Sequence, residues 1–201
     1  MSAIDRLGFV HLHLHTAFSL REGALTIARL IALATQDGMP ALAVTDANNL
    51  FGALEFSEKA AKAGIQPIPG IQLAVDFGDG SQSPGAADGR GNIVLIAKSE
   101  AGYANLIRLA TRAFLGPALG EAPHVTLAQL AADSGEMIAL TGGPEGGVDT
   151  LLARGRPEQA IARLEALQPL FDGRLYVELQ RHGLEQERRV EPQLLDLAYR
   201  R

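Results

Sequence analysis

The chain contains no cysteine and no tryptophan, and only 5% of its 201 residues are aromatic. The absence of cysteine excludes disulfides and thiolate metal ligands, and it is compatible with a reducing compartment. No apolar run approaches the roughly 20 residues that a membrane-spanning helix needs, and no basic segment precedes an apolar one as in a secretory signal. We therefore expect a soluble, cytoplasmic protein.

The sequence also lacks an excess of basic residues, since it contains 18 Lys and Arg but 23 Asp and Glu, which gives a net charge of −5. Proteins that bind nucleic acid by themselves normally carry a basic surface. We expect no direct nucleic-acid binding by this chain. Its length and its hydrophobic content of 47% are sufficient for one sizeable core, which predicts a single domain over residues 1–201.

Apolar, β-rich runs alternate with helical patterns along the chain, which is typical of a parallel sheet with crossover helices. Pro67 and Pro69 predict that the third strand starts at an edge or a bend, and residues 78–91 have the composition of an exposed loop. The pattern predicts an α/β fold, either a (β/α) barrel or a doubly wound sheet, that stops before its closing strand. Strands are expected at residues 9–16, 41–46, 65–77, 93–97, 137–141 and 175–179, and helices at 25–36, 52–63, 101–114, 127–132, 148–153, 157–171 and from 184 onward.

Three of the five histidines fall in one stretch, as His11, His13 and His15. In a strand they would share one face, because successive side chains alternate between the two faces. Two imidazoles two residues apart can chelate a divalent cation. A polar strand whose histidines are only hydrogen-bonded is the alternative, and the stretch alone leaves both open.

Further polar residues lie where the predicted strands end, which is where barrels of this kind gather their chemistry. Asp46 ends the second strand, Glu22 lies in the loop after the first, and His182 follows the sixth, just beyond Glu178 and Gln180. Such a cluster could hold a metal whose bound water attacks a phosphoester. Each residue also has a structural interpretation: Asp46 as a cap, Glu22 as a solvated loop charge and His182 as a turn residue.

The glycine-rich residues 142–147 lie between a predicted strand and a predicted helix. They lack the Lys-Ser/Thr of a P-loop and the spacing of a dinucleotide fingerprint, so we expect no nucleotide site there.

Residues 11–24, HLHLHTAFSLREGA, resemble the opening motif of PHP (polymerase and histidinol phosphatase) domains. The later segments look like the N-terminal PHP domain of bacterial DNA polymerase III alpha subunits, and they follow in the same order along the whole chain. These segments are GMPALAVTD at 38–46, NLFGA at 49–53, AGIQPIPG at 63–70, GYANL at 102–106, TGG at 141–143 and YVELQ at 176–180.

The resemblance implies a PHP-type distorted (β/α)7 barrel that binds up to three metals at its mouth in members that retain catalysis. By position, His13 and His15 match the paired histidine ligands, and Glu22 stands where an aspartate is usual. Asp46 and His182 match directly.

Three positions depart from the family pattern: Ala47 replaces a histidine, Gln72 a glutamate, and Asn92 a histidine. A late Asp-x-His pair is expected beyond Arg201. Because alanine supplies no ligand and glutamine supplies no charge, these losses weaken or abolish a polynuclear centre. We expect a degenerate site with at most one divalent metal, Zn²⁺, Mn²⁺ or Mg²⁺, held by residues from the set His13, His15, Glu22, Asp46 and His182.

The resemblance implies the PHP module of a replicative DNA polymerase alpha subunit, with the remainder of the polymerase chain and the proofreading exonuclease subunit as partners. The polymerase would be a DNA-directed nucleotidyltransferase, but its catalytic carboxylates would follow Arg201, and the helical pattern that stops there predicts a fragment of a longer chain. The alternative is an active metal-dependent phosphoesterase or 3′-5′ exonuclease. A stand-alone histidinol phosphatase is the least favoured interpretation, because polymerase-like segments run through the whole chain.

Overall fold

The computed structural model describes residues 8–80 and 89–200. The chain divides into two compact units, Met1–Gln72 and Leu73–Arg201. Part of the loop predicted at 78–91 lies outside the described residues, but Arg90 and Gly91 already belong to a strand. Among the described helices, none is long and apolar enough to cross a membrane.

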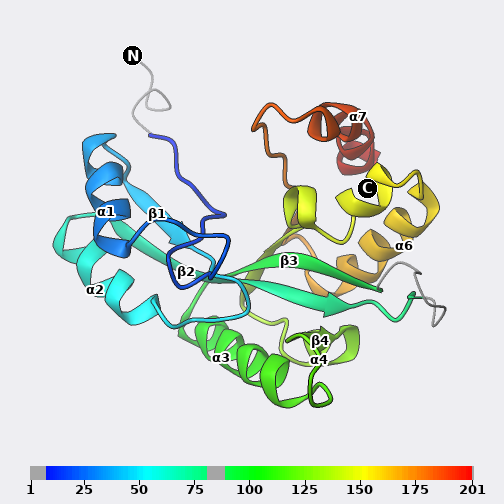
Figure 1. The fold of residues 1–201 in the computed structure, drawn as a ribbon, viewed down its shortest axis with the longest axis horizontal. Coiled ribbons are helices and arrows are strands. Elements are labelled where there is room, and N and C mark those ends of the chain that lie inside the picture. Colours follow the sequence, from blue (N-terminus) through cyan, green and yellow to red (C-terminus); the bar gives the residue numbers. More distant parts are fainter. Residues whose placement is uncertain (1–7, 81–88, 201) are drawn as a thin grey trace. The chain divides into compact units, whose positions relative to one another are not determined.

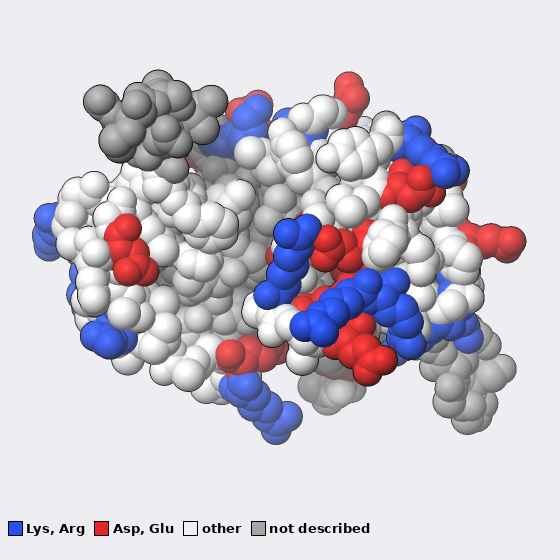
Figure 2. Space-filling view, turned by 90° about the horizontal axis from the view of Figure 1, so that it is seen from above, with Lys and Arg blue, Asp and Glu red and all other residues white. Residues whose placement is uncertain are grey.

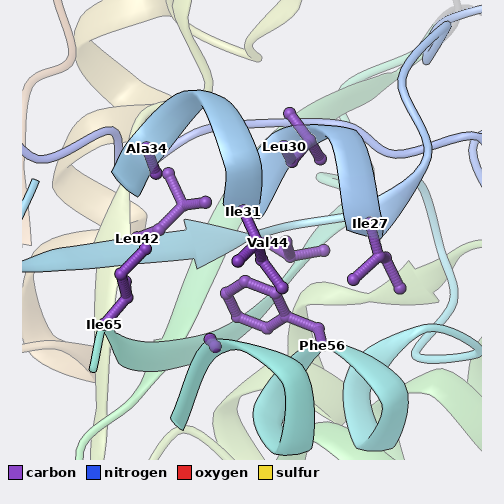
Figure 3. Close-up of a cluster of buried hydrophobic side chains, with 9 residues drawn as sticks. Ile27, Leu30, Ile31, Ala34, Leu42, Val44, Phe56 and Ile65 are labelled. Carbon is purple, nitrogen blue, oxygen red and sulfur yellow. The ribbon is translucent and has the colours of Figure 1, made fainter. Parts of the chain in front are cut away.

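The first unit contains α1 (Ile27–Gln36), β1 (Ala41–Val44), α2 (Ala53–Lys62) and the start of β2 (Gln66–Asp76) (Figure 1). Thr26 caps α1, because its side chain accepts a hydrogen bond from the N–H of Arg29. The apolar residues of α1 recur at helical spacing, and Ile27 and Ile31 point toward α2 (Figure 3). They form one buried cluster, whose members are Ile27, Leu30, Ile31, Ala34, Leu42, Val44, Phe56, Ala60 and Ile65.

β2 is continuous from Gln66, so Pro67 and Pro69 do not interrupt it. It pairs in parallel with β1, with Leu42 opposite Pro67 and Val44 opposite Pro69. The N–H of Gln66 donates to Pro40 on the β1 side. Because N–H groups alternate in direction along a strand, the two proline nitrogens face away from β1, and this pairing loses no donor.

The second unit contains the end of β2 and all later elements. α3 packs along β3, while α5 contacts both α6 and α7. The elements after β2 are β3 (Arg90–Ala97), α3 (Glu100–Leu115), β4 (Val125–Thr126), α4 (Leu127–Ala132), β5 (Met137–Leu140), a 3₁₀ turn (Gly143–Glu145), α5 (Asp149–Ala153), α6 (Pro157–Leu167), a second 3₁₀ turn (Gln168–Leu170), β6 (Leu175–Tyr176) and α7 (Glu185–Arg200). A second apolar cluster consists of Val148, Leu151, Leu152, Ala160, Leu164, Val190 and Leu194.

The strands follow the hydrogen-bonded order β1-β2-β3-β5-β6, with β4 beside β2. β5 pairs in parallel with β6, but β3 and β5 are antiparallel. The fold is therefore mixed α/β, as predicted, whereas the expected all-parallel arrangement is wrong. In the part of the chain that the structure describes, the six-stranded sheet is open and no closed barrel is seen.

Two other expectations need correction. The histidine stretch at residues 9–16 is not a regular strand. β6 spans only Leu175–Tyr176 instead of 175–179, and β4 was not predicted. Strands this short carry too few residues for a recognisable alternation.

Candidate functional site

The histidine stretch, residues 9–16, runs beside β1 as an extended chain and forms few backbone hydrogen bonds with it. The N–H of Ala43 donates to the carbonyl of His11 and that of Thr45 to the carbonyl of Leu14, both at 2.9 Å. Leu14 packs against the core of the first unit. His11 is exposed, and its ring meets Phe9 edge-on at 4.8 Å between centroids. His11 is thus separated in environment from the two histidines that follow it.

His13 and His15 lie next to each other, with ring centroids 5.3 Å apart. The Nε2 atom of His13 lies 2.9 Å from Oε1 of Gln72. Because an amide oxygen can only accept, this contact places the proton on Nε2. The backbone fixes Gln72 there: its N–H donates to Thr45 at 3.2 Å, and its carbonyl accepts from Asn48 at 2.7 Å.

Glu22 reaches the same place from the following loop, since its Oε2 lies 3.1 Å from Nδ1 of His15. The loop returns closely to its own start at Gly23. A Cβ atom on Gly23 would lie 1.8 Å from the carbonyl oxygen of Thr16, so only glycine fits. His15 is therefore a neighbour of both His13 and Glu22, and Gly23 allows the loop to place the carboxylate.

Asp46 is buried, with 2% exposure, and both of its oxygens accept hydrogen bonds. Oδ1 accepts from the N–H of Thr16 at 2.7 Å and from the hydroxyl of Ser19 at 2.5 Å, while Oδ2 accepts from the hydroxyl of Thr16 at 2.8 Å. Ser19 in turn accepts from the N–H of Ala47 at 2.9 Å. Asp46 thus anchors the loop that carries Glu22.

Thr16 and Ser19 were not singled out from the sequence. The available signal was a pair of hydroxyl residues three apart, placed directly after the histidines, which is a common local capping pattern. Nothing in the sequence indicates that their acceptor would be a carboxylate 27 to 30 residues away.

His182 belongs to the second unit, where its Nδ1 lies 2.8 Å from Oε1 of Glu187. The other carboxylate oxygen of Glu187 accepts from the N–H of Leu184 at 3.1 Å, which caps the start of α7. Burial alone raises the pKa of Glu187, but the hydrogen bonds from His182 and Leu184 hold it below its usual value. His182 therefore contacts the residue that caps α7. This position resembles the role as a turn residue that the sequence suggested.

Among the described residues, no three His, Asp or Glu side chains gather as a ready metal cluster. The metal set predicted from the sequence remains a prediction, with His13, His15, Glu22 and Asp46 in the first unit and His182 in the second.

Comparison with known proteins identifies the family of this fold. A family model described as the PHP domain matches residues 11–182. The chain belongs to the PHP domain family. Its match begins at His11 and ends at His182, so it includes every residue of the predicted metal set.

This PHP domain is similar to the N-terminal region of bacterial DNA polymerases. The chain is 42% identical to the DNA polymerase III subunit alpha of Caulobacter vibrioides over 200 residues, which is 99% of the chain and 17% of that protein. It is 38% identical to the error-prone DNA polymerase of Symbiobacterium thermophilum over 96% of the chain and 18% of that protein. The match to alpha subunits lies in their N-terminal region. The chain thus spans less than a fifth of the length of these relatives.

Among solved structures, the PHP domain is similar to a protein from Bifidobacterium adolescentis described as a metal-dependent phosphoesterase. The TM-score is 0.56 at 16% identity, over 95% of this chain and 83% of the other. At this identity, the similarity shows that the two share a fold.

Proposed function

We propose that this chain is the PHP module of a bacterial replicative DNA polymerase III alpha subunit. The observation that carries the proposal is the 42% identity to an alpha subunit over 99% of the chain. In this role residues 1–201 act as one structural domain of a cytoplasmic polymerase, and nucleotidyl transfer belongs to the remainder of the alpha chain. The module itself has no catalytic residue in that transfer.

The proposal includes a degenerate metal site. Gln72 is neutral, and its amide oxygen accepts the Nε2 proton of His13, which keeps that nitrogen from binding a metal in the same arrangement. The side chain of the neighbouring Ala47 has no atom that can bind a metal. Because a polynuclear centre depends on several charged ligands, these residues do not fit one.

A single metal fits the remaining donors better. His15 and Glu22 are already neighbours, at 3.1 Å, and His13 lies beside His15. Two imidazoles and one carboxylate are suitable ligands for Zn²⁺ or Mn²⁺. Asp46 is less suitable, because a metal would have to displace hydrogen bonds from Thr16 or Ser19.

The edge strand β6 and the groove beside it favour the remainder of the alpha chain as a partner. β6 pairs with β5 on one edge, and an apolar groove of about 870 Å³ lies between β6, the end of α6 and α7. Tyr176 and Tyr199 in this groove are 55% and 87% exposed. A strand that follows α7 by the usual right-handed crossover would lie beside β6. We propose that the longer chain supplies this strand and completes the barrel.

Docking of the proofreading exonuclease subunit is part of the same proposal. On the face shown in Figure 2, basic and acidic side chains are interspersed and form no broad basic surface. Such a face is more suitable for binding a protein than for binding nucleic acid. Binding of the exonuclease subunit of the same organism, measured by calorimetry, tests it. Absence of binding by both this chain and the full-length alpha subunit would refute this part.

Hydrolysis of a generic phosphodiester with added Mn²⁺ or Zn²⁺ tests the degenerate site. We expect no activity above that of a His13→Ala/His15→Ala variant. We expect that restoring the family residues, by Ala47→His with Gln72→Glu, increases Mn²⁺ binding. Metal-dependent turnover that disappears in the double-alanine variant would instead establish the alternative function, an active phosphoesterase or 3′-5′ exonuclease, which the proximity of His13, His15 and Glu22 favours.

A further inference from the structure

The segment NLFGA contains no predicted metal ligand, yet it contacts the loop of residues 16–25, which carries Glu22. The segment follows β1 and ends at the start of α2. Asn49 is 6% exposed, and its Nδ2 donates to two carbonyl oxygens, those of Ala47 at 2.9 Å and Phe18 at 3.2 Å. Because Phe18 lies in the Glu22 loop, this one amide group joins the loop to the chain that leaves β1.

Two further features of NLFGA fix this contact. Oδ1 of Asn49 accepts a hydrogen bond from the N–H of Phe51 at 3.2 Å, so both ends of the amide have partners and its orientation is set. Gly52 lies against Phe18, since a Cβ atom on Gly52 would lie 2.9 Å from Cδ2 of Phe18 and 3.0 Å from Cδ1 of Ile27. Asn49 therefore holds the backbone of Phe18, and the absence of a side chain at Gly52 makes room for its ring.

The Glu22 loop needs such contacts because its backbone is strained. Arg21 has a φ of 77°, in the left-handed region that residues with a side chain rarely adopt. Strain of this kind persists only where surrounding contacts fix the chain. The N–H of Glu22 donates to the carbonyl of Ser19 at 3.1 Å, but this bond lies within the loop. Asp46 and Asn49 connect the loop to the chain after β1 and so determine where it lies.

We propose that Asn49 is a positioning residue for the Glu22 carboxylate and, through it, for a metal bound by His13, His15 and Glu22. The metal part of this inference rests on the proposed function. Oε2 of Glu22 lies 3.1 Å from Nδ1 of His15, and the path of the loop sets this distance. Residues that orient metal ligands from behind typically change metal affinity by about 10–100-fold. Asn49 acts in this way through the backbone of Phe18.

Hydrogen exchange of the metal-free chain, followed by NMR, tests the positioning of the loop. Asn49→Ser keeps a neutral side chain that can accept from the N–H of Phe51, but it is too short to reach the carbonyl of Phe18. We expect the backbone amides of Glu22 and Gly23 to exchange about tenfold faster in this variant, because the loop opens more often. Unchanged exchange of these two amides overturns the proposal.

The matched control is Asn105→Ser in the second unit. It removes another buried amide that donates to a carbonyl oxygen, that of Gly135 at 2.7 Å. A general loss of stability would affect both variants alike. We therefore expect the amides of Glu22 and Gly23 to exchange at the wild-type rate in this control, and faster exchange there to the same extent as in Asn49→Ser overturns the proposal.

Gly52→Ala covers the case in which Asn49→Ser does not fold. The backbone of Gly52 has a φ of −86°, which alanine adopts readily, so the new methyl group acts mainly by displacing Phe18. We expect the amides of Glu22 and Gly23 to exchange faster in this variant too. If they do not, the loop does not depend on its contact with NLFGA and the proposal fails.

Calorimetric titration with Mn²⁺ tests the metal part of the inference. We expect the wild type to bind one Mn²⁺, Asn49→Ser to bind it about tenfold more weakly, and Asn105→Ser to bind it like the wild type. Equal affinity of Asn49→Ser and the wild type overturns the role of Asn49 at the metal. If millimolar Mn²⁺ does not bind the wild type, the single-metal part of the proposed function fails, and the exchange measurement alone decides whether Asn49 positions Glu22.

Discussion

The Asp149 side chain is expected to make the folded chain less stable as the pH rises. Its pKa is raised from 3.8 to about 7, mainly by burial and then by Glu178. A carboxyl whose folded pKa is raised contributes full stability below its unfolded pKa and loses it as the pH passes through the folded value. The penalty therefore grows between about pH 4 and about pH 7 and is constant above.

The size of this effect follows from the two pKa values. Each pH unit between them corresponds to about 1.4 kcal/mol, so the full penalty is about 4 kcal/mol. This is an upper value, because local relaxation and water entry reduce it. It is nevertheless a large fraction of the 5–15 kcal/mol that is typical of folded domains.

Asp149→Asn removes the charge and keeps the shape. In urea titrations with EDTA, followed by circular dichroism, we expect the variant to unfold at higher urea than the wild type at pH 8 and at similar urea at pH 4. Asp37→Asn, at an exposed position, is the matched control and should change little at either pH. If Asp149→Asn does not become relatively more stable between pH 4 and pH 8, the burial argument is wrong.

Three other substitutions test the fold and the site. Phe56→Ala empties a fully buried position in the first core and should cost about 3–5 kcal/mol in urea unfolding; a loss below 1 kcal/mol would contradict the packing in Figure 3. Thr16→Val removes the hydroxyl that donates to Asp46 and should cost about 1–3 kcal/mol, whereas Thr35→Val, whose hydroxyl bonds only to its own helix, should cost less. Glu187→Gln should destabilise the chain above about pH 5 and have less effect as the pH falls, because the folded pKa of Glu187 is lowered; the same destabilisation at pH 3 and pH 7 would refute that pKa.

Local patterns predicted the helices well. The spacing of Ile27, Leu30, Ile31 and Ala34 predicts α1, and these four residues are its buried face. The helix at residues 127–132 has the predicted bounds. Helical hydrogen bonds connect residues four apart, so a short window of sequence contains most of the information.

Strand pairing was predicted less well, because it depends on residues far apart in sequence. The alternation in β3 and β5 is the same for parallel and antiparallel neighbours, and only the structure shows that they are antiparallel. The histidine stretch alternates like a strand, yet the described structure gives it an irregular extended form beside β1. Alternation predicts which face of a strand is buried, but it does not predict which other strand will be its hydrogen-bonded neighbour.

The candidate site was predictable as a set of residue types, but the partners of those residues were not. Gln72 illustrates the difference. From the sequence it is a lost carboxylate, while the structure adds that its amide accepts a hydrogen bond from His13, 59 residues away. Asp149 carried no motif at all, since an acidic residue at a helix start is usually a solvated favourable charge.

Under the proposed function, the contacts of Gln72 and Asp46 give a physical reason why the two histidines can persist without a polynuclear metal site. An imidazole in a partly buried place needs polar partners. Gln72 accepts a hydrogen bond from His13, and a carboxylate oxygen of Glu22 lies 3.1 Å from Nδ1 of His15. Asp46 accepts three hydrogen bonds from the loop, from the N–H and hydroxyl of Thr16 and the hydroxyl of Ser19. His13, His15 and Asp46 thus each have a structural contact that does not require metal. Under the proposed function, Gln72→Glu alone would bury a carboxylate at a position that is 4% exposed, and we expect it to destabilise the metal-free chain unless Mn²⁺ is present.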